Sequence, residues 1–501
     1  MGPGFRRGGV FDLLIPLVLA WLLIAIPASA ETLDPDAAAG QALFRHGIGA
    51  SGAVAATLGA GQVPVQATAM PCASCHGRDG RGRPEGAVVP LDITGPVLGA
   101  PAERPGLGRR RGYDRAAIIR AVTLGIDAEG RALDLVMPRY RLSLEDAGHL
   151  VAYLQSLGMA AEPGVTPDRL VLGTILARED APEGAVLRAF IDRLDTAGGL
   201  FGRQVELVAR PAVPSPAEAV RRLLAERPVF ALVAPWIAHD ERAIADFAEA
   251  EGVPVIGAET LFPDAAGPAQ RYLFFLDGGV PAEARILAQE AGRLGPAKLA
   301  LLERADLPAG DAAAAVFARA GTPVLRRRLG EADAPEALAR DLAEAGIGRI
   351  LWLAPGLDGF AAAAAGAGYR PALLAPAEFG AFLLDHPMQP ALLAFRSAPG
   401  DRTTDGLQAY RELAAAYHLP AADQPAQLRA LAAIRLAVDA LERVGRDLTR
   451  ERLVTALEAV RDFRSGLLPP ISFGQSRRIG STGVWLLRPG GAPEWADLTR
   501  R

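Results

Sequence analysis

The chain has 501 residues, half of them hydrophobic, and its basic and acidic side chains nearly balance to a formal net charge of -4. This length exceeds one ordinary domain, so we expect two or three domains. The weakly negative balance excludes the strongly basic surface with which nucleic-acid-binding proteins hold the phosphate backbone.

The first 30 residues have the pattern of a secretory signal peptide. Two arginines at positions 6 and 7 precede an apolar stretch over residues 13–27, and Ala28-Ser29-Ala30 is a small-residue cleavage site. We therefore expect cleavage near Ala30, export to the periplasm, and a mature chain that begins at Glu31. The alternative is an uncleaved anchor helix, because the apolar stretch nearly reaches membrane-spanning length.

Both cysteines of the chain lie in one short motif, Cys72-Ala73-Ser74-Cys75-His76. The alternatives are a disulfide, a zinc site, which would need further Cys or His ligands, and a thioredoxin-like motif, which would need a strand before it. C-x-x-C-H is the attachment signal of c-type haem, in which two thiols bond to one porphyrin edge and the histidine binds the iron. We therefore predict one covalent haem c on Cys72 and Cys75, with His76 as an axial iron ligand.

Two amphipathic segments flank this motif. Residues 35–46 form one predicted helix, which contains Gly40. Residues 143–157 form the other, with Ser143 as its N-cap. Together with the motif, these helices resemble class I cytochrome c over about residues 35–158. The resemblance implies an all-α haem domain whose first and last helices cross with Gly40 against Tyr153, and the long insert at residues 47–70 departs from it.

The same resemblance implies a methionine as the second axial ligand. Met137 stands in Met137-Pro138, just ahead of the last helix, where the family has a Met-Pro pair. Pro138 also favours an extended backbone at Met137, as a loop ligand requires. The alternatives are that Met137 only packs in the protein interior, and that either His149 or no residue is the second axial ligand of the iron. A Met/His pair suits electron transfer rather than oxygen or peroxide chemistry.

The pattern changes after the haem region. Residues 159–168 are rich in Gly, Pro and Ala and are interpreted as a linker between a domain at residues 31–158 and a second at residues 169–501. Buried-strand patterns then alternate with helical segments, which predicts a two-lobed α/β domain with parallel sheets. The expected strands lie at residues 170–175, 205–208, 230–233, 253–256, 299–302 and 350–353, and the first of them is followed by a helix at about residues 184–196.

The second half resembles the type I periplasmic binding proteins, specifically the receptors of branched-chain amino acid (Leu/Ile/Val) transporters. The matching stretches include the turn at residues 195–202 (DTAGGLFG), the strand that ends in Ala234-Pro235, and the strand at residues 252–256 (GVPVI). The resemblance implies a small-molecule site in a cleft between two lobes.

The expected cleft residues depart from the family pattern. His239 stands where the family has a hydroxyl residue, and Trp236 replaces a small residue. Glu259 and Thr260 follow the next strand, and Asp306 follows the strand at residues 299–302. These five residues are the candidate ligand contacts. Glu259 would repel a carboxylate and Trp236 offers a ring for stacking, so the pattern disfavours an amino-acid ligand. The alternative is that Trp236 and His239 only fill the cleft.

Two functions fit these patterns. The first is a periplasmic electron carrier, rather than an enzyme, whose second domain binds a small molecule or docks on a redox partner. Such a fusion would suit a periplasmic oxidation system, for example one fed by a quinoprotein dehydrogenase. The alternative is a solute-binding receptor of an ABC transporter with an accessory haem domain. We prefer the first, because a transport receptor gains little from a covalent redox cofactor. A third candidate, an enzyme that uses the haem catalytically, is disfavoured by the single haem and by Met137 as the expected ligand.

Overall fold

The computed structural model describes residues 33–497, apart from residues 85–87, 105–107, 264–266, 268–269, 305–306, 308, 331–332 and 386–389. The predicted signal peptide and Asp306 therefore lie outside the described residues. Among the described helices, none combines the length and the hydropathy needed to cross a membrane. The contacts within the chain divide it into two units, residues 1–74 with 92–160 and residues 75–91 with 161–501.

The first unit is built around helices, and its two long helices have the predicted ends. Asp34 caps the first of them by accepting a hydrogen bond from the backbone N–H of Asp36, at 2.9 Å. Ser143 caps the last by accepting from the N–H of Asp146, at 3.0 Å. Capping side chains satisfy backbone donors that the first turn leaves without partners. The helices are α1 (Pro35–His46), α2 (Cys72–His76), α3 (Gly95–Gly99), α4 (Arg115–Leu124) and α5 (Leu144–Ser156).

Helices α1 and α5 pack closely at Gly40. A Cβ atom at Gly40 would lie 2.0 Å from the carbonyl oxygen of His149 and 2.8 Å from the Cβ of Tyr153. The ring of Phe44, one turn further along α1, lies 5.2 Å from the ring of Tyr153. Only glycine allows this approach of two backbones. The expected contact of Gly40 with Tyr153 is present.

The insert at residues 47–70 forms short antiparallel strands that brace the helical framework. The strand β3 pairs with β4 on one side and with β7 on the other, so that Thr57 lies opposite Arg139 and Ala56 opposite Tyr140. The sequence did not predict these strands. Their bounds, with those of the other short strands of this unit, are β1 (Ile48–Gly49), β2 (Gly52–Ala53), β3 (Ala55–Leu58), β4 (Val63–Gln66), β5 (Ala102–Arg104), β6 (Gly108–Arg110) and β7 (Arg139–Tyr140).

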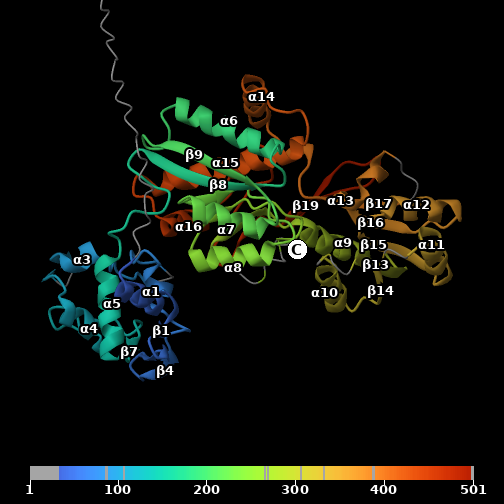
Figure 1. Cartoon of the computed structure of the whole chain (residues 1–501). Coiled ribbons are helices and arrows are strands. Elements are labelled where there is room, and N and C mark those ends of the chain that lie inside the picture. Colours follow the sequence, from blue (N-terminus) through green and yellow to red (C-terminus); the bar gives the residue numbers. More distant parts are fainter. Residues whose placement is uncertain are drawn as a thin grey trace, which may run out of the picture. The chain divides into compact units, whose positions relative to one another are not determined.

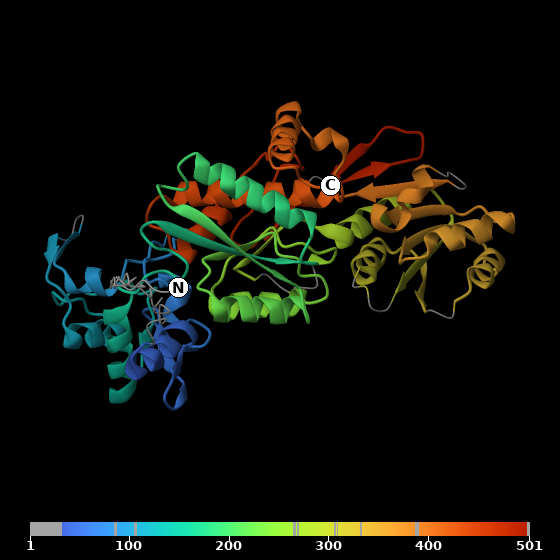
Figure 2. The ribbon, with the colours of Figure 1, turned by 45° about the horizontal axis from the view of Figure 1, so that its top comes forward.

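The second unit contains two sheets, and the first of them is entirely parallel. Its strand order is β18-β12-β11-β10-β8-β9, and we call this sheet with its helices lobe 1. Helices α6 and α15 cover one face and α7 and α8 the other (Figures 1 and 2). The strands are β8 (Arg169–Leu176), β9 (Gln204–Pro211), β10 (Ala231–Val233), β11 (Val255–Ile256), β12 (Leu273–Asp277) and β18 (Ile479–Ser481). The helices are α6 (Pro182–Thr196), α7 (Pro216–Glu226), α8 (Glu241–Glu251), α14 (Thr404–Ala416), α15 (Gln424–Val444) and α16 (Arg450–Glu458).

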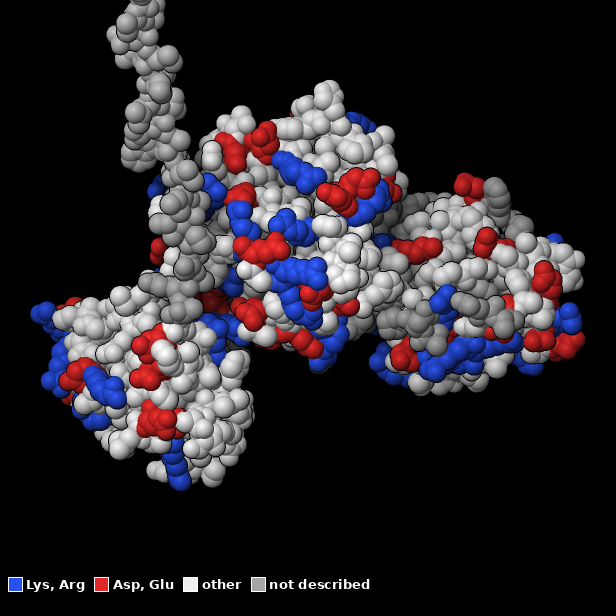
Figure 3. Space-filling view, viewed as in Figure 1, with Lys and Arg blue, Asp and Glu red and all other residues white. Residues whose placement is uncertain are grey.

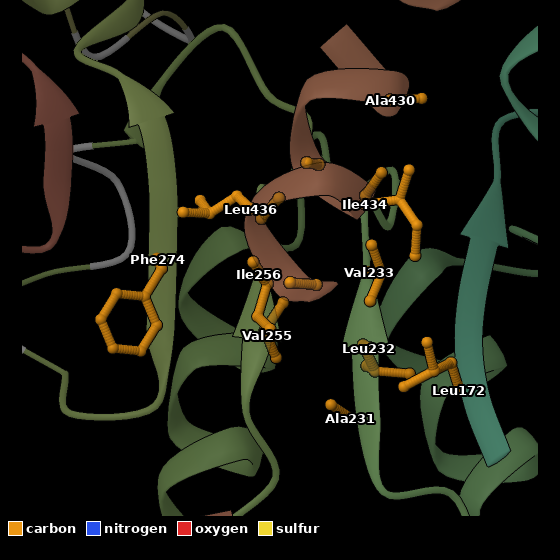
Figure 4. Close-up of a cluster of buried hydrophobic side chains, with 14 of the residues drawn as sticks. Leu172, Ala231, Leu232, Val233, Val255, Ile256, Phe274, Ala430, Ile434 and Leu436 are labelled. Atoms are coloured by element: carbon orange, nitrogen blue, oxygen red, sulfur yellow. The ribbon is translucent and has the colours of Figure 1, made fainter. Parts of the chain in front are cut away.

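The core of lobe 1 lies between this sheet and α15. Figure 4 shows Ile434 and Leu436 of α15 beside Val233 of β10 and Ile256 of β11. All four side chains are buried. Strands that are buried on both faces need near-continuous apolar runs, which explains why these strands were visible in the sequence.

The second sheet, with its helices, forms lobe 2. Its order is β14-β13-β15-β16-β17-β19-β20, with parallel pairing as far as β17 and antiparallel pairing of β19 and β20. The strands are β13 (Lys298–Arg304), β14 (Val324–Leu329), β15 (Ile347–Leu353), β16 (Ala372–Pro376), β17 (Ala391–Phe395), β19 (Gly483–Leu487) and β20 (Glu494–Asp497). The helices are α9 (Gly279–Arg293), α10 (Gly310–Ala320), α11 (Pro335–Glu344), α12 (Leu357–Gly366) and α13 (Ala377–Gly380).

One edge of this sheet is the charged strand β14, and the other is β20. Arg326, Arg327 and Arg328 follow one another there, and the basic side chains form a band over this strand in the space-filling view (Figure 3). Arg326 pairs with Glu303 at 2.5 Å, and Arg327 pairs with Asp333 at 2.7 Å. Charged side chains on an edge strand hinder pairing with a foreign strand. We therefore assign these arginines to protection of the sheet edge.

The chain passes between the two lobes three times. The first passage runs from β12 to α9, the second from β17 to α14, and the third from β18 to β19. The apolar cores agree with this division, because residues before β12 and in α14–α16 pack in one cluster and those of α9–β17 in two others. We call these three crossing segments the hinge.

Residues 75–91, which follow the second cysteine, belong to the second unit. Arg78 donates hydrogen bonds to the carbonyl oxygens of Glu249 and Ala250, at 2.6 Å and 3.0 Å, at the last turn of α8. Asp79 accepts a hydrogen bond from the hydroxyl of Thr449, the N-cap residue of α16, at 2.9 Å. Lobe 1 therefore holds this segment through the ends of two helices.

Candidate functional site

The cysteine motif forms the short helix α2. Cys72 and Cys75 stand three positions apart on it, so their side chains project from one side. Both are partly buried thiols rather than a disulfide. Two thiols on one side of a helix turn, followed directly by an imidazole, match the donor set that haem c requires.

His76 is oriented by its own loop. Its Nδ1 lies 3.0 Å from the carbonyl oxygen of Leu91, so this nitrogen carries the hydrogen and donates it. Burial lowers the pKa of the His76 imidazole, and the hydrogen bond to Leu91 opposes that shift. Histidines that bind metals commonly use one ring nitrogen in this way and present the other to the metal. The Nε2 atom of His76 is thus the nitrogen available for iron.

Met137 borders the apolar core of the first unit, as does Cys72. Its backbone N–H donates to the carbonyl oxygen of Asp134, at 3.2 Å, and β7 begins two residues later. The hydroxyl of Tyr140 in β7 donates to the carbonyl oxygen of Met70, at 2.6 Å. The insert and β7 together hold the loop that carries Met137 in place.

The alternative axial residue, His149, has a different environment. Its Nε2 lies 3.6 Å from a carboxylate oxygen of Asp36 in the first turn of α1. Met159, beyond the end of α5, is 71% exposed. These surroundings favour Met137 as the thioether donor. The donors Cys72, Cys75, His76 and Met137 fit haem c by their chemistry.

In lobe 1, the loops after β10 and β11 bring two of the predicted cleft residues together. Trp236 and Glu259 form a parallel bridge, in which the N–H of Glu259 donates to the carbonyl oxygen of Pro235 at 2.8 Å. The N–H of Trp236 donates to the carbonyl oxygen of Ile175 at the end of β8, also at 2.8 Å. Both side chains are partly buried. Parallel strands therefore present Trp236 and Glu259 at their shared carboxyl edge, where ligands bind in such sheets.

The other predicted contacts are placed differently. Thr260 is buried and donates its hydroxyl to Glu241, and the same hydroxyl accepts from the N–H of Phe262 at 2.9 Å. His239 is exposed and has a left-handed backbone, with φ of 74°. The hydroxyl of Thr260 is therefore engaged by Glu241 at the start of α8 and by the N–H of Phe262, and the imidazole of His239 lies at the surface.

Sequence reasoning missed the arginine that holds Glu259. Arg429 on α15 is 8% exposed, and its Nε lies 2.9 Å from both carboxylate oxygens of Glu259. Its Nη1 donates to Asp277 at the end of β12. The expectation that Glu259 repels a carboxylate is weakened, because Arg429 compensates the charge of Glu259. No motif marks Arg429, which stands 170 residues further along an ordinary amphipathic helix.

The ion pairs continue across the hinge. Asp277 lies 3.7 Å from Arg396, and Arg396 pairs with Glu378 of α13 at 2.9 Å. Burial raises the pKa of Asp277, but Arg429 and Arg396 outweigh it and hold this pKa below its ordinary value. Burial and the nearby Glu259 raise the pKa of Glu183 at the start of α6. The result is a chain of alternating charges from Glu259 in lobe 1 to Glu378 in lobe 2.

Two protein-family models match the chain. Residues 181–492 match the model described as periplasmic binding protein, and residues 63–158 match that of cytochrome c. No curated protein matches the chain.

Solved structures resemble the second half of the chain in fold. A fatty acid ABC transporter substrate-binding protein from Thermomonospora curvata is 19% identical, with a TM-score of 0.53, covering 68% of this chain and 94% of its own. A branched-chain amino acid ABC transporter protein from Thermus thermophilus with bound valine is 14% identical, with a TM-score of 0.54, covering 66% and 98%. A substrate-binding protein from Desulfitobacterium hafniense in complex with Leu is 18% identical, with a TM-score of 0.52, covering 66% and 100%.

Proposed function

The chain belongs to the periplasmic binding protein family and carries a cytochrome c domain, and from this we propose that it is a periplasmic electron carrier whose binding domain recognises a small molecule. The observation that carries the redox half is the motif Cys72-Ala73-Ser74-Cys75-His76 inside the cytochrome c match. Because both cysteines of the chain stand in this motif, it provides for one covalent haem.

The proposed ligand set assigns each donor a role. Cys72 and Cys75 would attach the porphyrin, His76 would bind the iron through Nε2, and Met137 would supply a thioether ligand. When bound, haem c supplies a one-electron couple whose potential is higher with Met/His than with two histidines. The hydrogen bond from Nδ1 of His76 to Leu91 fixes the ring, and the pairing of β7 with β3 holds the loop of Met137.

The binding half of the proposal rests on the two-lobed fold. Among proteins of this fold, one has bound valine, one is in complex with Leu, and one is a fatty acid ABC transporter substrate-binding protein. The hydroxyl of Thr260 is engaged by Glu241 and by the N–H of Phe262, so it is not free to bind an amino-acid carboxylate. We therefore propose a ligand other than a simple amino acid, and a periplasmic redox partner such as a quinoprotein dehydrogenase.

A solute receptor of an ABC transporter with an accessory haem domain is the second candidate. The observation that favours it is that the fold relatives are transport receptors. The two candidates differ in whether the protein passes electrons. Rapid reduction by a periplasmic dehydrogenase and reoxidation by a second cytochrome would support the carrier. Ligand delivery to a permease with the haem removed would support the receptor.

The haem assignment is tested by staining and spectroscopy of the full chain. Replacing Cys72 and Cys75 together by alanine should abolish haem staining of the denatured chain, and replacing Met137 by alanine should remove the thioether–iron absorption band and lower the potential. Met159→Ala is the control, because that side chain is exposed beyond α5. Staining that survives the double cysteine change overturns the attachment site, and a band lost in His149→Ala instead overturns Met137.

A further inference from the structure

Residues 75–84, which we call the histidine loop, fold back on themselves behind His76. The N–H of Gly82 donates a hydrogen bond to the carbonyl oxygen of His76, at 2.9 Å. The N–H of Arg83 donates to the carbonyl oxygen of Cys75, at 2.8 Å. These two bonds fix the backbone at the residue that presents the imidazole. Whatever holds the histidine loop therefore also positions the Nε2 atom of His76.

The end of helix α8 in lobe 1 provides the first attachment of the histidine loop. Arg78 donates to the carbonyl oxygens of Glu249 and Ala250, at 2.6 Å and 3.0 Å. Its guanidinium carbon lies 5.5 Å from the ring centroid of Tyr272. The last carbonyls of a helix have no partner within the helix, and a guanidinium is a planar fork that can bind two of them at once. Lysine offers the same charge without this fork.

Helix α16 of lobe 1 holds the histidine loop at both of its ends. At its start, the hydroxyl of Thr449 donates to Asp79 at 2.9 Å and accepts from the N–H of Arg452 at 3.1 Å. At its end, Glu458 pairs with Arg83 at 3.4 Å. Thr449 and Glu458 are both buried. Lobe 1 thus binds the loop on either side of its closing hydrogen bonds.

The loop approaches lobe 1 most closely at Gly77, which directly follows His76. Its φ of 72° lies in the left-handed region that favours glycine. A Cβ atom there would lie 2.9 Å from a carboxylate oxygen of Asp79 and 3.7 Å from one of Glu451. Glu451 is buried and pairs with Arg271. Because these charges are buried and paired, the loop cannot shift here without disturbing them.

We propose that lobe 1 is the support for the axial histidine, and that Thr449 and Arg78 are positioning residues for the haem iron. Both act through the histidine loop and without contact to the porphyrin. A loosened loop admits water to the iron ligand, and water favours the more highly charged oxidised state, so the potential falls. The inference rests on the proposed haem attachment and adds that the binding domain sets the potential of the electron carrier.

The test is a redox titration of the full, haem-loaded chain with a substitution far from the haem motif in sequence. Thr449→Val removes the hydroxyl and keeps the side-chain volume and the net charge. We expect it to shift the redox equilibrium toward the oxidised form by about fivefold, the lower end of typical coupling between sites. Thr449→Ser keeps the hydroxyl and should restore the potential of the unchanged chain.

A matched control separates positioning from the loss of a helix cap. Thr403 caps α14 of the same lobe, where its hydroxyl accepts from the N–H of Gly406 at 3.0 Å. Thr403→Val should therefore leave the potential unchanged. An equal shift of the potential in Thr403→Val and Thr449→Val would overturn the proposal, because the effect would then follow from capping in general.

A second variant keeps the proposal testable if Thr449→Val fails to fold. Arg78→Lys preserves the charge and loses the fork, so it should lower the potential and speed hydrogen exchange at the amides of Gly82 and Arg83. Arg81→Lys is its control, because Arg81 pairs with an exposed carboxylate. Faster exchange with an unchanged potential overturns the positioning role while the haem assignment stands. A chain that carries no covalent haem overturns the proposed electron carrier, and this inference with it.

Discussion

Single residues impose the sharpest constraints on the haem unit, and Gly40 is the clearest of them. The carbonyl oxygen of His149 occupies the space that a side chain at Gly40 would need. Because that atom belongs to the backbone of α5, it moves only if the helix moves. The position therefore accepts no side chain without separating α1 from α5.

We predict that Gly40→Ala destabilises the haem unit by about 1–3 kcal/mol, the usual cost of overpacking. Gly148→Ala is the matched control on α5, because its Cβ would meet only the flexible end of Arg115, at 3.0 Å. That control should be neutral or stabilising by about 1 kcal/mol, since alanine favours helix. Thermal unfolding followed by haem absorbance measures both variants. Equal melting temperatures of Gly40→Ala and the unchanged chain would contradict the close crossing.

Glu283 on α9 is a buried carboxyl group at the hinge. It is fully buried, and neither of its oxygens has a hydrogen-bond donor among the described residues. Burial raises its pKa well above the ordinary value of 4.5, and Glu378 of α13 and Asp277 of β12 raise it further, while Arg396 opposes them. The folded chain therefore holds a proton at Glu283 that the unfolded chain releases at a lower pH.

The sign of the pH dependence follows from this difference. Below pH 4.5 both states are protonated, and as pH rises above 4.5 the unfolded state loses its proton first, so stability falls. We predict that Glu283→Gln gains stability over the unchanged chain by up to about 1.4 kcal/mol per pH unit in this window. Denaturant unfolding between pH 4 and 8 measures it, with the exposed Glu336→Gln as control. A pH-independent difference would show that Glu283 titrates normally.

At the scale of elements, the lobes are joined by ion pairs as well as by chain crossings. Arg429 of α15 pairs with Asp277 of β12 and with Glu259 in the loop after β11, and Arg396, just after β17, pairs with Asp277 across the hinge and with Glu378 of α13. Breaking a buried ion pair leaves its partner charged and without compensation, which costs more than the pair contributes. Arg429 pairs with two carboxylates, so its loss leaves both of them charged and without a compensating cation.

We predict that Arg429→Met destabilises the second unit by about 3–5 kcal/mol. The matched control is Arg443→Met on the same helix, because Arg443 pairs with Asp439 at 2.8 Å on the surface, with 44% and 32% exposure. That exposed pair should contribute less than about 1 kcal/mol. Urea unfolding followed by tryptophan fluorescence measures both. Similar losses of unfolding free energy in the two variants would show that Arg429 contributes no more stability than an exposed ion pair.

At the scale of the whole molecule, the boundary between the units follows contacts rather than the order of the chain. Residues 75–91 pack with residues 161–501, although the sequence assigns them to the haem domain. Arg78 meets the last carbonyls of α8, where cations are favoured by the helix dipole. Arg83 lies 3.4 Å from the buried Glu458 of α16. The predicted boundaries at residues 158 and 169 stay predictions.

We predict that a fragment of residues 161–501 is less stable than the same region within the full chain, by roughly 1–3 kcal/mol for the lost hydrogen bonds. Arg78→Ala in the full chain should reproduce part of this loss. Arg81→Ala should not, because the guanidinium of Arg81 pairs with the exposed Asp447, at 3.9 Å. Hydrogen exchange of α8 and α16 reports the effect locally. Equal stability of fragment and full chain would support a self-contained domain that begins at residue 169.

Features that depend on neighbours along the chain could be predicted from the amino-acid sequence. The spacing of Cys72, Cys75 and His76 identified the haem motif, because all its donors lie within five residues. The helices expected at residues 35–46 and 143–157 agree with α1 and α5 to within a residue, and Ser143 is the N-cap of α5 as expected. Continuous apolar runs revealed β8, β10, β11, β13 and β15, because strands covered on both faces leave no polar positions. The two-domain fold class followed from these elements.

Contacts between residues that are distant in the sequence could be identified only in the folded chain. Arg429 neutralises Glu259 across 170 positions, and Arg139 pairs with Thr57 in a strand too short to leave a periodic signal. Short edge strands and buried charges carry no local pattern, since their partners come from other parts of the fold. For the same reason the sequence did not reveal the pocket that Arg304, Leu329 and Trp352 line in lobe 2. These residues become neighbours only when β13, β14 and β15 align their carboxyl ends.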